Sequence, residues 1–152
     1  MIIRPNLARE KILRESSLYP KIGRFLQNRG WLVRYEIPPR VGSARRFDVV
    51  GVNSRRNQAV VVEAKLGHYR RTVDQASHRQ FVADFVYVSF PLAYAKGVAR
   101  SHIHELEDLG IGLLGVDGRA YELLLPHQSK HVNPDRRVEL INMVYEVRRR
   151  DG

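Results

Sequence analysis

Two carboxylates and one amine lie at the ends of two strongly apolar segments, residues 46–52 and 58–66. Asp48 comes near the start of the first segment, and Glu63 and Lys65 come near the end of the second. Unpaired charge is costly to bury, so a buried strand needs a reason to carry such residues. Glu63 and Lys65 are two apart and would share one face of a strand. A hairpin through residues 53–57 would then bring Asp48 beside them.

Such a cluster suits a divalent cation held by oxygen ligands, Mg²⁺ or Mn²⁺. Asp48 and Glu63 would be the ligands, helped by the backbone carbonyl of Ala64. Phosphodiester hydrolysis needs a cation that neutralises developing charge and lowers the pKa of bound water. Lys65 would orient or deprotonate the attacking water, or stabilise the pentavalent oxyanion. The alternative is a surface ion pair between Glu63 and Lys65 with Asp48 as a capping residue; we favour the metal site because of the surrounding strands.

The segments around these residues alternate between helical and strand patterns. We expect a helix from Leu18 to near Gly30, with Ser16 or Ser17 as its cap and Pro20 in its first turn. Further strands are expected at 31–37, 85–89, 111–116 and 120–125, and further helices at 72–83, 92–109 and from Asn133-Pro134 onward. The inner face of the last helix would carry Val138, Ile141, Val144 and Tyr145. This order predicts an α/β fold with a mixed central β-sheet flanked by helices.

Composition limits the class of protein. The 152 residues, 43% of them hydrophobic, predict one globular domain over 1–152, with residues 1–15 as a basic arm or short helix. Because the chain has no cysteine, disulfides, thiolate zinc sites and thiol nucleophiles are excluded. No apolar segment approaches membrane-spanning length, and the first residues do not form a signal-peptide pattern. We therefore expect a cytoplasmic protein with no membrane partner.

The charge distribution points to a polyanionic partner. The net charge is +10, and residues 1–46 hold 11 Lys or Arg against 3 Asp or Glu, while residues 47–152 hold 15 against 13. Most of these bases are arginines, which suit bidentate phosphate contacts. The alternative is a generally basic surface. We favour nucleic acid, and DNA in particular, as the partner.

The site residues resemble the motif of the PD-(D/E)XK nuclease superfamily. The sequence reads Arg46-Phe47-Asp48-Val49-Val50 and then Val62-Glu63-Ala64-Lys65, with Phe47 in place of the family's proline. The resemblance extends from Glu15 to about Val88, where residues 83–88 look like a strand of small bacterial members. It implies a restriction-endonuclease-like core. The resemblance is also compatible with a homodimer, because Holliday-junction resolvases of this superfamily are of similar size and act as dimers.

The same resemblance implies further site residues. An acidic residue on the first helix corresponds to Glu15, with Glu10 and Glu36 as rivals, and a glutamine on the helix after the motif corresponds to Gln75. Either could instead be an ordinary helix residue. Around the motif, basic and aromatic side chains could hold phosphates or lie in a solvated loop: Arg45, Arg46, His68, Tyr69, Arg70 and Arg71.

The function we expect is therefore a Mg²⁺- or Mn²⁺-dependent nuclease on DNA, and an endonuclease rather than an exonuclease. The length leaves no separate specificity domain, which favours structure-specific or partner-directed cutting over base-specific cutting. One alternative is a nucleic-acid-binding module that keeps the fold without cutting. Another is a nuclease directed at RNA.

Overall fold

The computed structural model of the chain describes residues 13–38 and 45–151. The expected N-terminal arm therefore lies almost wholly outside the described residues. The elements in chain order are η1 (Glu15–Leu18), α2 (Tyr19–Gln27), β1 (Leu32–Ile37), β2 (Phe47–Asn53), β3 (Gln58–Ala64), α3 (Tyr69–Arg79), β4 (Phe85–Pro91), α4 (Leu92–Leu109), β5 (Gly112–Val116), β6 (Ala120–Leu124) and α5 (Pro134–Asp151). The order is the one that the sequence pattern predicts.

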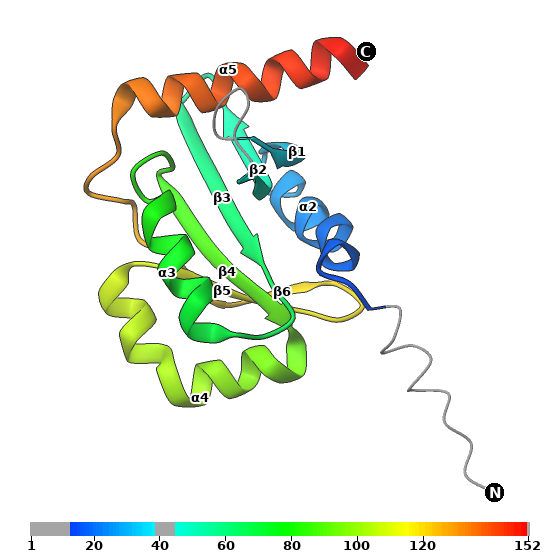
Figure 1. Cartoon of the computed structure of the whole chain (residues 1–152), viewed down its shortest axis with the longest axis vertical. Helices are drawn as coiled ribbons and strands as arrows, with labels where there is room; N and C mark the ends of the chain where they lie inside the picture. The colour runs from blue at the N-terminus through cyan, green and yellow to red at the C-terminus, as the bar shows by residue number, and fades with distance from the viewer. Residues whose placement is uncertain (1–12, 39–44, 152) are drawn as a thin grey trace, which may run out of the picture.

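One six-stranded mixed sheet forms the centre of the molecule, with its strands in sequence order from β1 to β6. β1, β2 and β3 pair antiparallel, β4 joins β3 and β5 in parallel, and β6 closes the sheet antiparallel to β5. Parallel neighbours need a crossover, and α3 and α4 supply the two that this sheet requires (Figure 1). The α/β class with a mixed sheet is confirmed.

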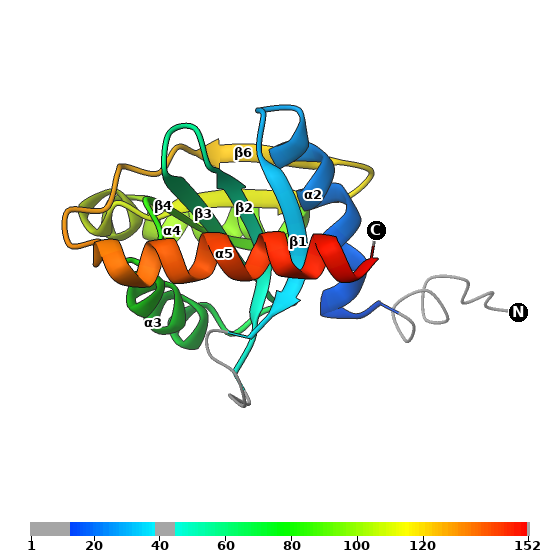
Figure 2. The same ribbon diagram turned by 90° about the horizontal axis from the view of Figure 1, so that it is seen from above.

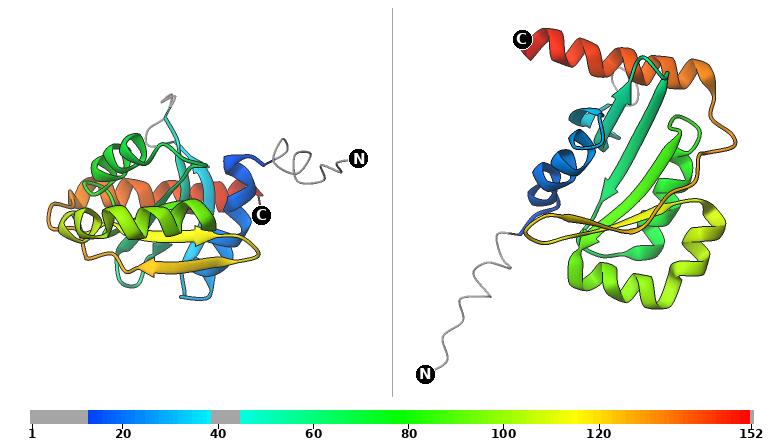
Figure 3. Two further views of the ribbon diagram at one scale, coloured as in Figure 1. Left: turned by 90° about the horizontal axis from the view of Figure 1, so that it is seen from below. Right: turned by 180° about the vertical axis from the view of Figure 1, so that it is seen from behind.

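Helices cover both faces of the sheet. On one face, α3 and α4 pack over β3, β4 and β5, and α5 runs across β1, β2 and β3 (Figures 1 and 2). On the other face, η1 and α2 are the described helical segments that pack against the sheet (Figure 3). Two hydrophobic clusters result, one on each side. The β-branched residues of β2 and β3 alternate between them, which explains why both strands read as continuous apolar runs.

Local signals in the sequence set the helix ends. Pro20 lies in the first turn of α2, and Gly110 ends α4 in the left-handed conformation, at φ 74°. The side chain of Asn133 accepts hydrogen bonds from the backbone N–H groups of Asp135 and Arg136, at 3.0 and 3.1 Å. It is therefore the N-cap of α5 that the Asn-Pro pair predicts. No helix within the described ranges has the length and apolar character needed to cross a membrane.

The inner face of α5 differs from the prediction at one position. Val138 is 44% exposed, whereas Leu140, Ile141 and Val144 are buried against the sheet. The buried stripe therefore includes Leu140 in place of Val138. Leu140 takes the inward place because it lies one helical turn before Val144.

A buried polar cluster around Asp84 joins α5 to the edge of β3. The Asp84 carboxylate is 1% exposed, accepts a hydrogen bond from the backbone N–H of Ala59 at 2.8 Å, and pairs with Arg137 of α5 at 2.9 Å. Its backbone carbonyl accepts a bond from the N–H of Ser129. Asp84 thus joins, through its carboxylate and its backbone carbonyl, three segments that are distant in sequence.

We expect Asp84→Ala to lower the free energy of unfolding by about 3–5 kcal/mol, because it leaves the partly buried guanidinium of Arg137 without its counter-charge. Urea denaturation followed by circular dichroism measures the loss. The matched control is Asp108→Ala on the exposed surface of α4, which should change stability by no more than about 0.5 kcal/mol. Equal, small effects of the two substitutions would contradict a supporting role for the cluster.

Candidate active site

The β2–β3 hairpin brings the two predicted carboxylates together. Val49 pairs with Val62 in the antiparallel ladder, so the same register places Asp48 opposite Glu63. The turn between the strands spans residues 54–57, where Asn57 adopts a positive φ of 53° that asparagine tolerates better than most residues. Both carboxylates therefore lie at the same end of the sheet, as the hairpin-length connection predicts.

Asp48 is held through both of its oxygens. It is 8% exposed. Oδ2 accepts hydrogen bonds from the backbone N–H of Ala64 at 2.8 Å and from Nζ of Lys65 at 3.3 Å. Oδ1 accepts a hydrogen bond from the hydroxyl of Tyr19 at 3.2 Å. These three donors fix the orientation of the carboxylate.

Glu63 is the most deeply buried charged group of the site, at 1% exposed. Its Oε1 lies 2.6 Å from Nε of Arg79 on α3. Burial raises the pKa of Glu63 to about 7, and the neighbouring Asp48 charge adds to the rise while Arg79 opposes it. The two carboxylates repel each other at one strand end. A cation between them would be stabilised because it reduces that repulsion.

Lys65 lies between two acids. Its Nζ is 3.3 Å from Oδ2 of Asp48 and 3.5 Å from Oε2 of Glu15. Burial lowers the pKa of Lys65, but Asp48, Glu15 and Glu63 outweigh it and raise that pKa above its ordinary value. Lys65 is therefore charged at neutral pH. This favours its action as a fixed positive charge over its action as a general base. Glu63 is buried and pairs with Arg79, so Glu63 and Lys65 do not form the simple surface pair that was the alternative.

The acid on the first helical segment is Glu15, which contacts the site through Lys65. Of its two rivals, Glu10 lies outside the described residues. Glu36 acts on the site by charge, since it contributes to the raised pKa of Tyr19 after burial and Asp48. The structure thus brings Glu15, Asp48, Glu63 and Lys65 together.

A hollow of about 430 Å³ opens beside this cluster. Its lining residues are Arg45, Arg46, Glu63, Lys65, Arg71, Asp74, Gln75, His78 and Arg79. Gln75 therefore lies where the resemblance places it, on α3 facing the site. Five of these residues are Lys or Arg and two are acidic, so the hollow carries a net positive charge.

The side chains of residues 68–71, directly after the motif, do not all face the hollow. Successive helical residues point about 100° apart. Arg71 lines the hollow. Tyr69 is 7% exposed, donates its hydroxyl hydrogen bond to Glu105 at 2.6 Å and stacks on His102. The surface role expected of Tyr69 is therefore wrong, and its ring joins α3 to α4.

Arg70 and His68 also differ from the expectation of a phosphate-binding loop. Arg70 forms an ion pair with Glu105 at 3.0 Å, away from the hollow. His68 is exposed and occupies the left-handed region, at φ 59°, immediately before α3. Its φ turns the chain from the site strand into the helix.

Two site residues were missed in the sequence. Arg79 lies one helical turn after Gln75, and Tyr19 lies four residues after Glu15. Residues four apart share an α-helix face, so Arg79 could have been proposed from Gln75, whereas Glu15 lies in a 3-10 turn that precedes Tyr19. Nothing in the local pattern, however, distinguishes them from other surface residues.

Asp48 and Glu63 are oxygen donors of the kind that a small divalent cation takes. Asp48 and Glu63 would hold it. That the backbone carbonyl of Ala64 is a third ligand stays a prediction. In the ranges 13–38 and 45–151, no three Asp, Glu, His or Cys side chains form a group that could hold a metal ion. Two carboxylates suit Mg²⁺, which keeps several waters and relies partly on substrate phosphate.

Comparisons with known proteins establish the fold and leave the activity open. No family model matches the chain, and no curated protein matches it. A solved structure, the SPO1766 protein of unknown function from Silicibacter pomeroyi, is similar with a TM-score of 0.69 at 20% sequence identity. The similarity covers 92% of this chain and 90% of that one. It supports an α/β protein with this arrangement of sheet and helices.

The pKa of Glu63 predicts a pH-dependent stability in metal-free buffer. A carboxyl group whose pKa is raised to about 7 by folding takes up a proton on folding, so its contribution to stability falls as pH rises from about 4.5 to about 7. Relative to Glu63→Gln, the wild type should lose up to about 3 kcal/mol over this window. Urea denaturation in EDTA at several pH values measures the difference. Glu107→Gln, at an exposed position, is the control, and a Glu63→Gln difference that stays constant with pH would contradict the assignment.

Proposed function

We propose that this chain is a divalent-metal-dependent nuclease that hydrolyses phosphodiester bonds in DNA. The observation that carries the proposal is the pair of facing carboxylates at the end of two buried strands. The register of the hairpin places Asp48 opposite Glu63 at the end of the strands, and Lys65 contacts Asp48 there. Proteins seldom bury like charges together without a function. A metal site explains both the burial and the convergence.

Each residue has a role in this proposal. Asp48 and Glu63 hold the cation, which would supply charge neutralisation and a more acidic bound water. Lys65, charged and held by Asp48 and Glu15, stabilises the negative charge that develops on the phosphate. Glu15 and Tyr19 position Lys65 and Asp48. Gln75 lines the approach, where its amide can contact substrate or water.

The positive hollow supports a phosphate-rich substrate. Arg45, Arg46 and Arg71 line it beside Glu63 and Lys65, and arginines there can contact the backbone on either side of the cleaved bond. Backbone contacts carry no base identity, so the proposal favours structure-specific or partner-directed endonuclease action. A junction substrate cut by a homodimer is one form of this.

A second candidate function is a binding module that does not cut. The observation that favours it is the 2.6 Å contact between Arg79 and Glu63. A guanidinium at this place already neutralises one of the two metal ligands. If that pair persists in the presence of Mn²⁺ and DNA, the basic hollow binds nucleic acid while the carboxylates serve the fold alone. RNA in place of DNA is the third candidate.

The proposal is tested by cleavage of labelled linear, single-stranded, flapped and four-way DNAs with Mg²⁺, Mn²⁺ or EDTA, with RNA as a further arm. Lys65→Ala should lower cleavage by at least about 100-fold while metal and DNA binding stay near wild type, because a protonated lysine is not a ligand. Asp48→Ala should lose both cleavage and Mn²⁺ binding by calorimetry. Wild-type cleavage by Lys65→Ala would refute the assignment. Absence of cleavage and of Mn²⁺ binding in the wild type would favour the binding module.

Binding of duplex DNA should weaken steeply with salt, because phosphate neutralisation releases counterions. Arg71→Gln should reduce the slope of log affinity against log salt by about 1, since Arg71 is exposed and lines the hollow. Arg100→Gln, exposed on α4 away from the hollow, is the matched control and should leave the slope unchanged. Affinity that is flat with salt would argue against a polyanionic substrate. Fluorescence anisotropy in EDTA provides the measurement without cleavage.

A further inference from the structure

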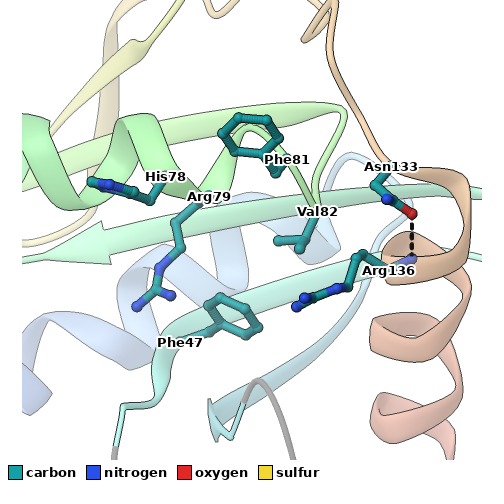
Figure 4. A pocket seen from close by; sticks show the side chains of 7 residues that line it. All are labelled: Phe47, His78, Arg79, Phe81, Val82, Asn133 and Arg136. Atoms are coloured by element: carbon teal, nitrogen blue, oxygen red, sulfur yellow. Dashed lines mark hydrogen bonds between the residues drawn. The ribbon is translucent and has the colours of Figure 1, made fainter.

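A second groove lies beside the candidate active site, between the end of α3 and the start of α5. It has a volume of about 340 Å³ and is lined by Phe47, His78, Arg79, Phe81, Val82, Asn133 and Arg136. Figure 4 shows Arg79 and Arg136 directed from opposite sides toward Phe47, with Phe81 on the far wall. The backbone N–H of Asn133 donates a hydrogen bond to the carbonyl of Phe81 at 2.7 Å. The two walls are therefore joined, and the groove is part of the fold.

The groove combines an exposed aromatic ring with cationic side chains. Phe81 is 57% exposed, the highest fraction of any aromatic side chain among the described exposed hydrophobics. Two arginines and one histidine line the groove with it, and no carboxylate of residues 13–38 or 45–151 does. An exposed phenylalanine has no evident role in folding, because its ring contributes little burial. An aromatic ring beside arginines is the combination that binds nucleotides, with the base stacked and the phosphate paired.

The groove continues directly from the hollow of the candidate active site. His78 and Arg79 line both. Arg79 contacts Glu63 through Nε, while its guanidinium lies 4.4 Å from the centre of the Phe47 ring at the floor of the groove. A strand whose phosphate reaches the carboxylates could therefore place a neighbouring nucleotide against Phe81.

We propose that this groove binds an unpaired nucleotide of the DNA substrate, with its base stacked on Phe81 and its phosphate bound by Arg136. The inference rests on the proposed function and adds to it a substrate class, DNA with a single-stranded segment at the cleavage site. A base in a duplex has its faces covered by its neighbours, whereas an unpaired base offers one face to an aromatic side chain. The volume is at the lower end of the range for small-molecule sites, about 300–1,000 Å³, and suits one nucleotide.

The test compares two DNA probes in EDTA, a blunt duplex and the same duplex with a single-stranded tail. Anisotropy gives the ratio of their affinities for the wild-type chain and for variants. Phe81→Ala should lower the preference for the tailed probe by about tenfold, the loss expected for one stacked base, while Phe81→Trp should retain it. Arg136→Gln should also lower it. Leu125→Ala, at an exposed apolar residue, and Arg100→Gln should leave it unchanged.

The proposal is overturned if the wild type shows no preference for the tail, if Phe81→Ala keeps it, or if both probes lose affinity equally. The exposure of Phe81 means that its substitution should fold normally, and the Phe81→Trp variant separates stacking from structural damage. The nuclease assignment is tested separately, by the cleavage assay with Lys65→Ala in Mg²⁺. Cleavage at the wild-type rate would refute that assignment without affecting the groove. If the wild-type chain prefers the tailed probe but does not cut DNA, the nucleotide-binding role of the groove stands and the catalytic role of the site is refuted.

Discussion

The register between β2 and β3 is the constraint on which the candidate site depends. A slip of one residue would turn Asp48 and Glu63 to opposite faces of the sheet. The slip is prevented because both faces of these strands are buried: Val49 and Val62 pack under α2, and Val50 and Val61 pack under the helices of the other face. The hydrophobic cores on the two sides thus position a polar site that neither core contains.

Charge balance links the site to helices on both faces of the sheet. From one side, η1 and α2 supply Glu15 to Lys65 and Tyr19 to Asp48. From the other side, α3 supplies Arg79 to Glu63. Each buried charge has a partner, which limits the desolvation penalty of the cluster. A cation bound at Glu63 would have to displace or accommodate Arg79. Whether Arg79 stays paired with Glu63 when metal is present therefore distinguishes a nuclease from a binding module.

The fold and the centre of the site were predictable for local reasons. Each of three signals depends only on the backbone near one residue, and the structure confirms all three. They are the strand periodicity, the helix cap at Asn133 and the helix end at Gly110. The errors came where a decision required knowledge of a distant neighbour. Val138 has the spacing of a core residue but misses the sheet, and Tyr69 reads as a surface aromatic although α4 covers it with Glu105 and His102. The importance of Asp84 is likewise visible only once Arg137 reaches it.

The sequence by itself determined the α/β class, the order of the elements, the meeting of Asp48 with Glu63 and Lys65, and the excess of positive charge. These follow from patterns within about 20 residues, where the period of a strand or the length of a hairpin settles the geometry. Tertiary structure alone decided that Arg79 pairs with Glu63, that Glu15 reaches Lys65, and that Phe81 and Arg136 line one groove. Those contacts join residues on separate elements, and their directions depend on how helices pack against the sheet.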